Sequence, residues 1–274
     1  MLPAVKLGST MITRLIIGGN PFSGNSHVSR ELDAAMMDYF TTEKIKQTLY
    51  RAAECGINAV QLRGDKHIMR ILREFWLEGG KLSWIGQTTP ESLSIDSNIS
   101  QMAGAGAAAI YHHGTVTDAL FKEGNYDEIK RRLAVIRKTG LPVGLGTHMP
   151  YVIEFADEHK WDIDFYMACV YNLSRIDRVS SAITGKANTE EPFFEADIPV
   201  MYKTIRTTNK PCIAFKILGA TRRCQSQETV KAAFAEAYKN IKPADMVNIG
   251  VYPKDIDQVG LDAVYAKEGM EKAL

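Results

Sequence analysis

Three basic side chains in this sequence stand where chemistry is expected, because each of them follows a short apolar run. They are His113, His148 and Lys216. Imidazoles move protons near neutral pH, and an amine in apolar surroundings acts as a nucleophile, a base or an oxyanion partner. We predict that these three residues are catalytic and that they converge at one open site.

The histidines also allow plainer interpretations. His112 and His113 are neighbours on an extended run, so their side chains point to opposite faces and at most one faces the site unless the backbone turns there. We favour His113. The alternative is that one of the two packs while the other caps a backbone group, and that His148 only marks a helix start before Pro150.

Two groups of charged residues have equally open roles. Lys216 lies in an apolar run, where a lysine is rare without a purpose, but a structural ion pair with Asp164 or Glu154 is the alternative. Arg63 and Asp65 form either a clamp for a carboxylate or phosphate, or a surface pair on a loop.

Polar side chains also end most of the other apolar runs. If these runs are parallel strands of one sheet, their ends meet on one side of the fold, where substrates bind. The predicted substrate-binding residues are Asn20, Gln61, Arg63, Asp65, Gln87, Tyr171 and Asn172.

The spacing of potential ligands gives only a weak indication of a metal. No HExxH, CxxC or EF-hand pattern occurs in the sequence. A divalent metal would need His113 and His148 with Asp65 as the third ligand. Carboxylates further along the chain are the alternative third ligands, namely Asp177, Glu190 and Glu191.

The elements that would position these residues alternate between strand and helix. Strands are predicted over 14–18, 58–62, 82–86, 107–112, 142–145, 165–170, 211–215 and 246–249. Helices are predicted over 42–55, 66–78, 95–103, 126–139, 150–159, 194–207, 227–240 and 256–271. Eight such pairs predict an α/β fold of the (β/α)₈ TIM-barrel class.

The connections complete this prediction. Residues 5–7 and 11–13 flank Gly8, Ser9 and Thr10 and predict an N-terminal β-hairpin that closes the bottom of the barrel. The long connections 20–41 and 171–193 emerge at the opposite rim and are expected to be functional loops. No composition shift divides the chain, so we expect a single domain over residues 1–274.

Composition excludes several classes of protein. The chain has 33 Lys and Arg against 32 Asp and Glu, which does not predict a nucleic-acid binder. Four widely spaced cysteines and an N-terminus without an export pattern favour a cytoplasmic, soluble protein without a membrane partner. The expected partner is a small molecule, and nothing in the sequence indicates the oligomeric state.

Short motifs in order along the whole chain resemble the aldo/keto reductase superfamily. They include the opening VKLGSTMITRLIIGGNPF, Gly56-Ile57-Asn58, the strand ending in His113, Gly144–His148, Val170-Tyr171-Asn172 and Ile249-Gly250. The resemblance implies a barrel with an N-terminal hairpin. It also implies a catalytic histidine at His113.

The other catalytic residues of that family do not match. The family uses an Asp, a Tyr, a Lys and a His, but this chain has Gln61 where the Asp is expected and Gln87 where the Lys is expected. The stretch that would supply the Tyr contains none. The resemblance therefore does not predict conventional reductase activity.

Three hypotheses follow. The first is an enzyme that acts on a small sugar-like or carbonyl compound by acid–base chemistry of the lyase, isomerase or hydrolase type. The second is an NADP-dependent oxidoreductase with Tyr111, Tyr171 or Tyr252 as a rearranged proton donor; its cofactor would be held by Arg222, Arg223, Gly250 and Lys254. The third is a ligand-binding barrel without catalysis.

Overall fold

The computed structural model describes residues 2–177, 179–186 and 191–273, and within them eight parallel strands close a barrel. The strands are β3 (Leu15–Gly18), β4 (Ala59–Arg63), β5 (Ser83–Gln87), β6 (Ala109–His112), β7 (Val143–Thr147), β8 (Phe165–Cys169), β9 (Cys212–Phe215) and β10 (Met246–Gly250). Each pairs with the next, and β10 pairs with β3. The predicted TIM barrel is confirmed.

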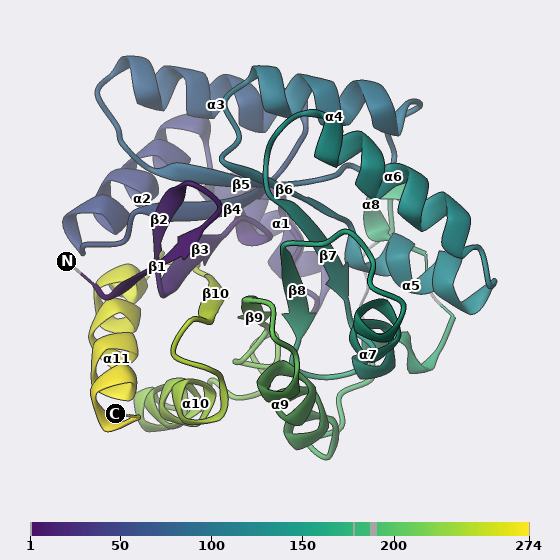
Figure 1. Ribbon diagram of the computed structural model, residues 1–274. Coiled ribbons are helices and arrows are strands. Elements are labelled where there is room, and N and C mark those ends of the chain that lie inside the picture. Colours follow the sequence, from purple (N-terminus) through teal and green to yellow (C-terminus); the bar gives the residue numbers. More distant parts are fainter. Residues whose placement is uncertain (1, 178, 187–190, 274) are drawn as a thin grey trace.

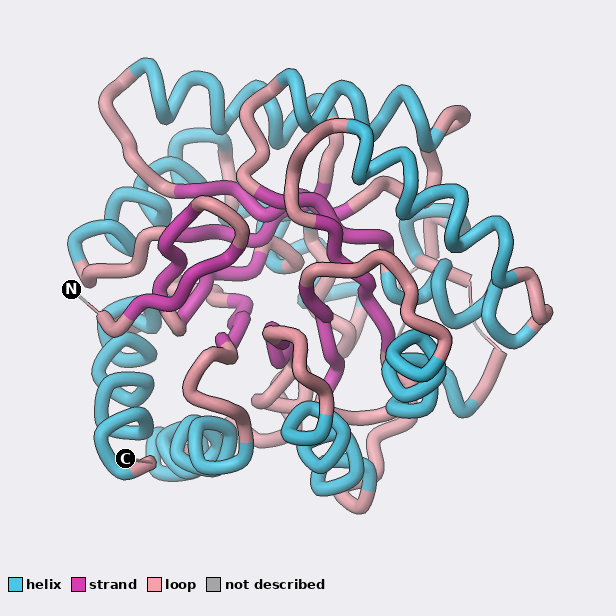
Figure 2. Tube along the Cα trace, in the orientation of Figure 1, coloured by secondary structure: helices cyan, strands magenta, loops and turns pink. Residues whose placement is uncertain are grey.

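Helices surround this barrel and cover its outer face (Figure 2). Those that the sequence predicts are α2 (Thr42–Glu54), α3 (Lys66–Leu77), α4 (Ile95–Gly104), α6 (Tyr126–Lys138), α7 (Pro150–Glu158), α9 (Asp197–Thr207), α10 (Gln227–Asn240) and α11 (Gln258–Lys272). Helix α3 shows why they form. Its buried residues Ile68, Ile71, Leu72 and Phe75 recur at helical spacing, and the side chain of Asp65 caps its first turn.

Several elements lie where the sequence analysis expects loops. They are η1 (Pro21–Ser23), α1 (Arg30–Tyr39), α5 (Gly114–Lys122), η2 (Leu173–Arg175) and α8 (Ser181–Thr184). In α1, Ser29 caps the first turn by accepting a hydrogen bond from Leu32 N. Helix α5 is difficult to predict because it begins with glycine and β-branched residues, which are weak helix formers.

A two-stranded hairpin closes one end of the barrel, as the sequence predicts (Figure 1). Strands β1 (Ala4–Leu7) and β2 (Thr10–Thr13) are antiparallel, with Ala4 opposite Thr13. Leu7 and Ile12 are buried in the same apolar cluster as the inward-facing side chains of the barrel strands. The opposite end, where the strands have their carboxyl ends, is therefore the end at which a site can open.

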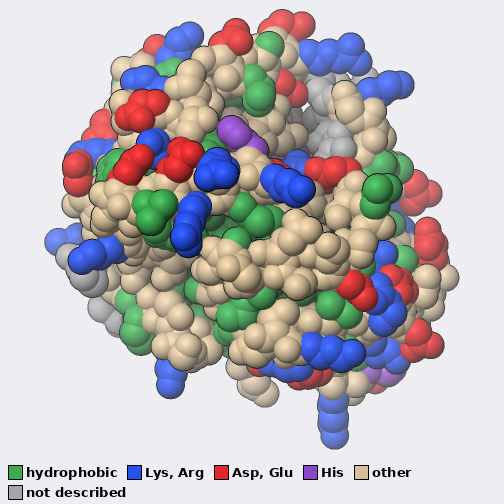
Figure 3. Space-filling model, turned by 90° about the horizontal axis from the view of Figure 1, so that it is seen from above, with side chains coloured by type: hydrophobic (Ala, Val, Ile, Leu, Met, Phe, Trp, Pro, Cys, Tyr) green, Lys and Arg blue, Asp and Glu red, His purple; other side chains and the backbone are tan. Residues whose placement is uncertain are grey.

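The surface carries charges of both signs. On the face drawn in Figure 3, Lys and Arg side chains lie among Asp and Glu side chains and do not form one basic patch. In the described part of the chain, no helix combines the length and apolar character that crossing a lipid bilayer requires.

Candidate functional site

The structure places His113, His148 and Lys216 around one cavity at the carboxyl ends of the barrel strands. This cavity, of about 80 Å³, adjoins a larger one of about 330 Å³. Both are lined by Asn20, Asn25, His27, Gln87, Tyr111, Phe215 and Lys216. The predicted convergence of the three basic residues is thus present, whereas their catalytic roles remain a prediction.

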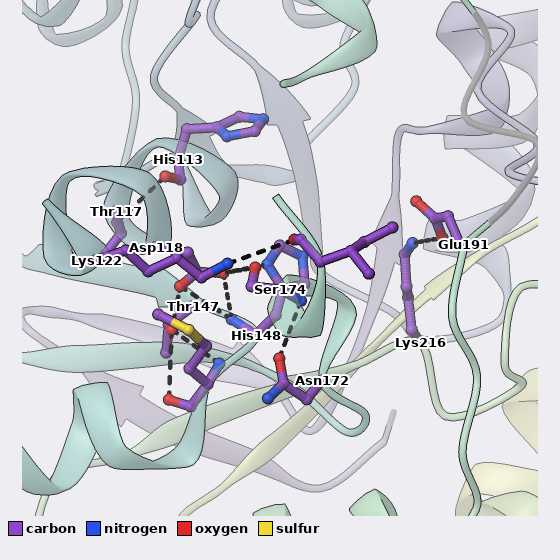
Figure 4. Close-up of polar contacts among 12 residues, drawn as sticks. His113, Thr117, Asp118, Lys122, Thr147, His148, Asn172, Ser174, Glu191 and Lys216 are labelled. Atoms are coloured by element: carbon purple, nitrogen blue, oxygen red, sulfur yellow. Dashed lines mark hydrogen bonds and ion pairs between the residues drawn. The ribbon is translucent and has the colours of Figure 1, made fainter. Parts of the chain in front are cut away.

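His148 is held by a buried carboxylate that the sequence analysis missed. Its Nδ1 lies 2.7 Å from Oδ2 of Asp118, and its backbone N donates to the same oxygen at 3.1 Å (Figure 4). Both residues are buried, with 5% of His148 and 1% of Asp118 exposed. A ring that donates from Nδ1 presents Nε2 as its basic atom, so this contact selects the tautomer of His148.

Asp118 is itself fixed by hydroxyl groups from two other elements. The hydroxyl of Thr147 donates to Oδ1 at 2.5 Å, and the hydroxyl of Ser174 donates to Oδ2 at 2.6 Å. Thr147 ends β7 and Ser174 lies in η2, so β7, η2 and α5 converge on this carboxylate. These buried contacts therefore fix the orientation of the Asp118–His148 pair.

Two glycines allow α5 to approach β7 closely enough for this pairing. A Cβ atom on Gly146 would lie 2.8 Å from the carbonyl oxygen of His112 and 3.0 Å from the backbone N of Gly114. A Cβ atom on Gly114 would lie 3.2 Å from Cε1 of His148. Because neither glycine has a Cβ atom, the backbone of α5 and the ring of His148 can lie this close to β7.

Lys216 belongs to a second polar network in the same cavity. Its Nζ lies 2.9 Å from Oε2 of Glu191, while Nδ1 of His27 lies 2.8 Å from Oε1 of the same carboxylate. Asn20 contacts Nε2 of His27 at 3.1 Å. The partner of Lys216 is therefore Glu191. The expected alternatives, Asp164 and Glu154, hydrogen-bond to Arg137 and Thr204 respectively.

Unusual backbone conformations gather at this cavity. Among the described residues other than glycine, five have positive φ, and four of them line the larger cavity: His27, Lys216, Ala220 and Thr221. The φ angles of His27 and Lys216 are 61° and 62°. Such conformations cost free energy and concentrate at functional sites, so their clustering supports a function for this end of the barrel.

His112 and His113 have different surroundings, in agreement with the expectation that at most one of them faces the site. His112 is fully buried, and its Nδ1 lies 2.8 Å from the hydroxyl of Thr117. Burial, with Arg132 and His113 adding to the effect, lowers the pKa of His112 to about 3. His112 is thus a packed residue, and His113 is the histidine of this pair that lines the cavity.

Amide and phenol groups line the larger cavity where it meets the barrel. Asn248 donates from Nδ2 to Oε1 of Gln61 at 3.1 Å, and Gln87 donates from Nε2 to the hydroxyl of Tyr111 at 2.7 Å. Burial raises the pKa of Tyr111 well above its usual range, so the phenol keeps its proton. Within the described residues, Oδ1 of Asn248 is buried and accepts no hydrogen bond. These groups suit a ligand with hydroxyl or carbonyl oxygens.

Three of the predicted substrate-binding residues lie outside both cavities. Asp65 caps α3 and pairs with Nε of Arg63 at 2.8 Å, although Arg63 itself lines the smaller cavity. Tyr171 is fully buried against Phe193. Asn172 accepts a hydrogen bond from Ser174 N and caps η2.

Most of the residues expected to hold a cofactor are also engaged elsewhere. Arg222 donates to the carbonyl oxygens of Gly219 and Glu191, and Arg223 to Ile217 O and Glu236. Neither arginine lines a cavity at the barrel mouth, nor does the exposed Lys254, whereas Gly250 lines the larger cavity.

The predicted metal site is not assembled. In the described ranges, no three His, Cys, Asp or Glu side chains form a group suited to a metal ion. Asp65 is directed to Arg63 and α3 and does not join His113 and His148. Glu191 is held by His27 and Lys216. Glu190, another of the expected ligands, falls outside the described residues.

Comparison with known proteins gives the fold and no closer relationship. The sequence matches no family model and no curated protein. Structural neighbours include a truncated 3-deoxy-D-arabino-heptulosonate 7-phosphate synthase from Thermotoga maritima, with a TM-score of 0.56 and 15% identity over 98% of this chain and 90% of that one.

Two other neighbours are equally remote in sequence. An N-acetylmannosamine-6-phosphate 2-epimerase from Clostridium perfringens has a TM-score of 0.51 and 12% identity over 86% of each chain. An aldo-keto reductase from Bacillus halodurans, in its holo form, has a TM-score of 0.55 and 11% identity over 100% of this chain and 96% of that one. At these identities the likeness establishes the barrel alone.

Proposed function

We propose that this barrel is an enzyme that acts on a small sugar-like or carbonyl compound by acid–base chemistry. The observation that carries the proposal is the Asp118–His148 pair, whose histidine lines the same cavity as His113 and Lys216. A histidine oriented by a buried carboxylate is an arrangement suited to moving protons during catalysis. Neighbours that are named as acting on sugar phosphates agree with the substrate class.

The chemistry that fits these groups is removal of a proton next to a carbonyl group. Nε2 of His148 takes the proton as the C–H bond breaks, and the electron pair moves through the carbon to the carbonyl oxygen. The ammonium of Lys216 and the hydroxyl of Tyr111 stabilise the enolate oxygen by hydrogen bonding. His113 exchanges a proton with the neighbouring substrate oxygen. Return of a proton to either carbon then gives back the substrate or its isomer.

Hydrogen–deuterium exchange tests the proposal without knowledge of the natural substrate. Dihydroxyacetone, glyceraldehyde and erythrose are incubated with the enzyme in D₂O, and NMR follows deuterium incorporation next to the carbonyl. We expect exchange above the uncatalysed rate for at least one compound. The variant His148→Gln, which keeps a polar side chain but cannot move the proton, should lower the rate by about 10²-fold or more.

Exposed His159 provides a matched control, since it packs on Phe155 away from the cavity. His159→Gln should exchange like the unaltered protein. Equal exchange by His148→Gln and His159→Gln, or no exchange with any of the three compounds, would contradict the proposal.

A further inference from the structure

The larger cavity extends from the barrel mouth to a buried acid on α11. Its outer arm lies between α1, α10 and α11 and is lined by Leu32, Met36, Cys224, Val230, Leu261 and Asp262. Leu32, Met36, Val230 and Leu261 form apolar walls, whereas Gln227 and Gln258, the first residues of α10 and α11, add amide groups to the lining of the cavity. At about 330 Å³, the cavity is within the range of sites that hold drug-sized ligands and exceeds what a three- or four-carbon sugar fills.

Asp262 is an unusual group to find at the end of an apolar arm. Asp262 is 6% exposed and lines the cavity, and no described group forms a hydrogen bond or ion pair with its carboxyl group. The charge of Asp257 affects the pKa of Asp262, and Asp262 in turn affects the pKa values of Cys224 and Tyr238. None of these three groups is a cation. Burial thus raises the pKa of Asp262 to about 8.

Burying a carboxyl group without a partner is unfavourable, so a structural role does not explain Asp262. A polar group left without a hydrogen-bond partner in a mostly buried place destabilises the fold, and more so if it is charged. An apolar residue at the same place on α11 would avoid this cost. Because Asp262 lines the cavity, a ligand in the outer arm can supply the missing donor.

The charge of the arm restricts what that ligand can be. Among the described residues that line the larger cavity, the basic ones are His27 and Lys216, and both contact Glu191 at the barrel mouth. A phosphate or carboxylate in the outer arm would therefore have no described cation beside it, and it would repel Asp262 whenever that group is ionised. A basic nitrogen group would instead pair with this carboxylate, and apolar atoms would contact Leu32, Val230 and Leu261.

We propose that the outer arm binds an apolar segment of the substrate that ends in a basic nitrogen group, with Asp262 as the partner of that group. This inference rests on the proposed function for the reacting end of the substrate. It describes a molecule with two parts: a small oxygenated end at His148 and Lys216, and an apolar amine-bearing end between α10 and α11.

Binding of fragments tests the arm separately from catalysis. The probes are 2-phenylethylamine, 2-phenylethanol and phenylacetate, which share a ring and differ in charge, and NMR titration measures their affinity. We expect the amine to bind at least 10-fold more tightly than the alcohol and the acid to bind weakest. Asp262→Asn should abolish the preference for the amine, while Asp262→Glu should retain most of it.

Glu271→Gln is the matched control, since Glu271 is an exposed acid on the same helix. It should leave all three affinities unchanged. The inference is overturned if the unaltered protein prefers the alcohol or the acid, or if folded Asp262→Asn still prefers the amine. His148→Gln should keep the amine preference, so loss of exchange in that variant and loss of amine binding in Asp262→Asn report on the two proposals independently.

Discussion

At the scale of single residues, Asp118 connects the stability of the site to its proposed chemistry. It accepts hydrogen bonds from the hydroxyls of Thr147 and Ser174 and from the backbone and ring of His148. An amide in its place has one acceptor oxygen and an NH₂ group that must face one of these donors. The contact that selects the tautomer of His148 would then be lost or reversed.

We therefore expect Asp118→Asn to lower deuterium exchange by about 10²–10⁴-fold. We also expect it to lower the free energy of unfolding by about 1.5–3 kcal/mol, because hydrogen bonds to a buried charged acceptor are lost. Exchange measurements and denaturant melts check the two effects. Ser174→Ala removes one donor and keeps the carboxylate, so its effect on exchange should be much smaller. Equal effects of the two variants would contradict this role of Asp118.

Asp262 leads to a prediction about pH. In the unfolded chain the pKa of an Asp is about 4, whereas burial raises that of Asp262 to about 8 in the folded protein. Between these values the folded state binds a proton that the unfolded state has released, so this group makes the free energy of unfolding fall as pH rises. Asp262→Asn has no such proton.

The stability of Asp262→Asn relative to the unaltered protein should therefore increase from pH 4 to pH 8. Denaturant melts at several pH values measure this difference. Cys224, Tyr238 and Asp257 surround the group and are present in both proteins. A difference that stays constant across this range, as expected for Glu271→Gln, would show that Asp262 ionises normally.

At the scale of elements, the site depends on how closely α5 approaches β7. The contact that matters is between backbones, since a Cβ atom on Gly146 would meet the carbonyl oxygen of His112 and the backbone N of Gly114. Backbone atoms yield less easily than the end of a flexible side chain. A methyl group here must separate the two elements and displace Asp118 from His148.

Gly146→Ala should thus destabilise the protein by about 1–3 kcal/mol and reduce exchange more than this loss of stability explains. Gly104→Ala is a suitable control, because Gly104 ends α4 and its Cβ atom would meet nothing within 4 Å. That variant should be neutral or slightly more stable. Thermal melts and exchange rates at a temperature where both variants are folded distinguish these outcomes.

The same elements show what the sequence could and could not predict. Strands and amphipathic helices such as α3 were predictable because apolar periodicity reports burial directly. Helix α5 was not, since its buried face carries Thr115, Thr117 and Asp118 in place of an apolar stripe. An acid shortly after a strand end was the available signal for Asp118, but its partner His148 lies 30 residues away in the chain.

The second network had an even weaker signal. Lys216 stood out as a lysine in an apolar run, but its contact with Glu191 joins the segment directly after β9 to the loop that precedes α9. His27 reaches the same carboxylate from the loop before α1. These contacts form only when the closed barrel brings the loops together. Neither the composition of the chain nor the spacing of its residues predicts them.

At the scale of the whole molecule, the hairpin that closes the barrel and the proposed site of chemistry lie at opposite ends of the barrel. The β1–β2 hairpin closes one end through Leu7 and Ile12, and both cavities open at the other. In barrels of this type, residues at the carboxyl ends of the strands carry function, while the opposite end contributes stability. The two properties should therefore be separable by mutation.

Ile12→Ala tests this separation. Ile12 is fully buried, so removing three carbons leaves a void in the barrel core and should lower the free energy of unfolding by about 2–5 kcal/mol. Met11, its neighbour on β2, is 52% exposed, and Met11→Ala should have little effect on stability. At a temperature where both variants are folded, their deuterium exchange rates should equal that of the unaltered protein. A slower rate in folded Ile12→Ala would mean that packing at the closed end determines the geometry at the mouth, and the two ends would then not be independent.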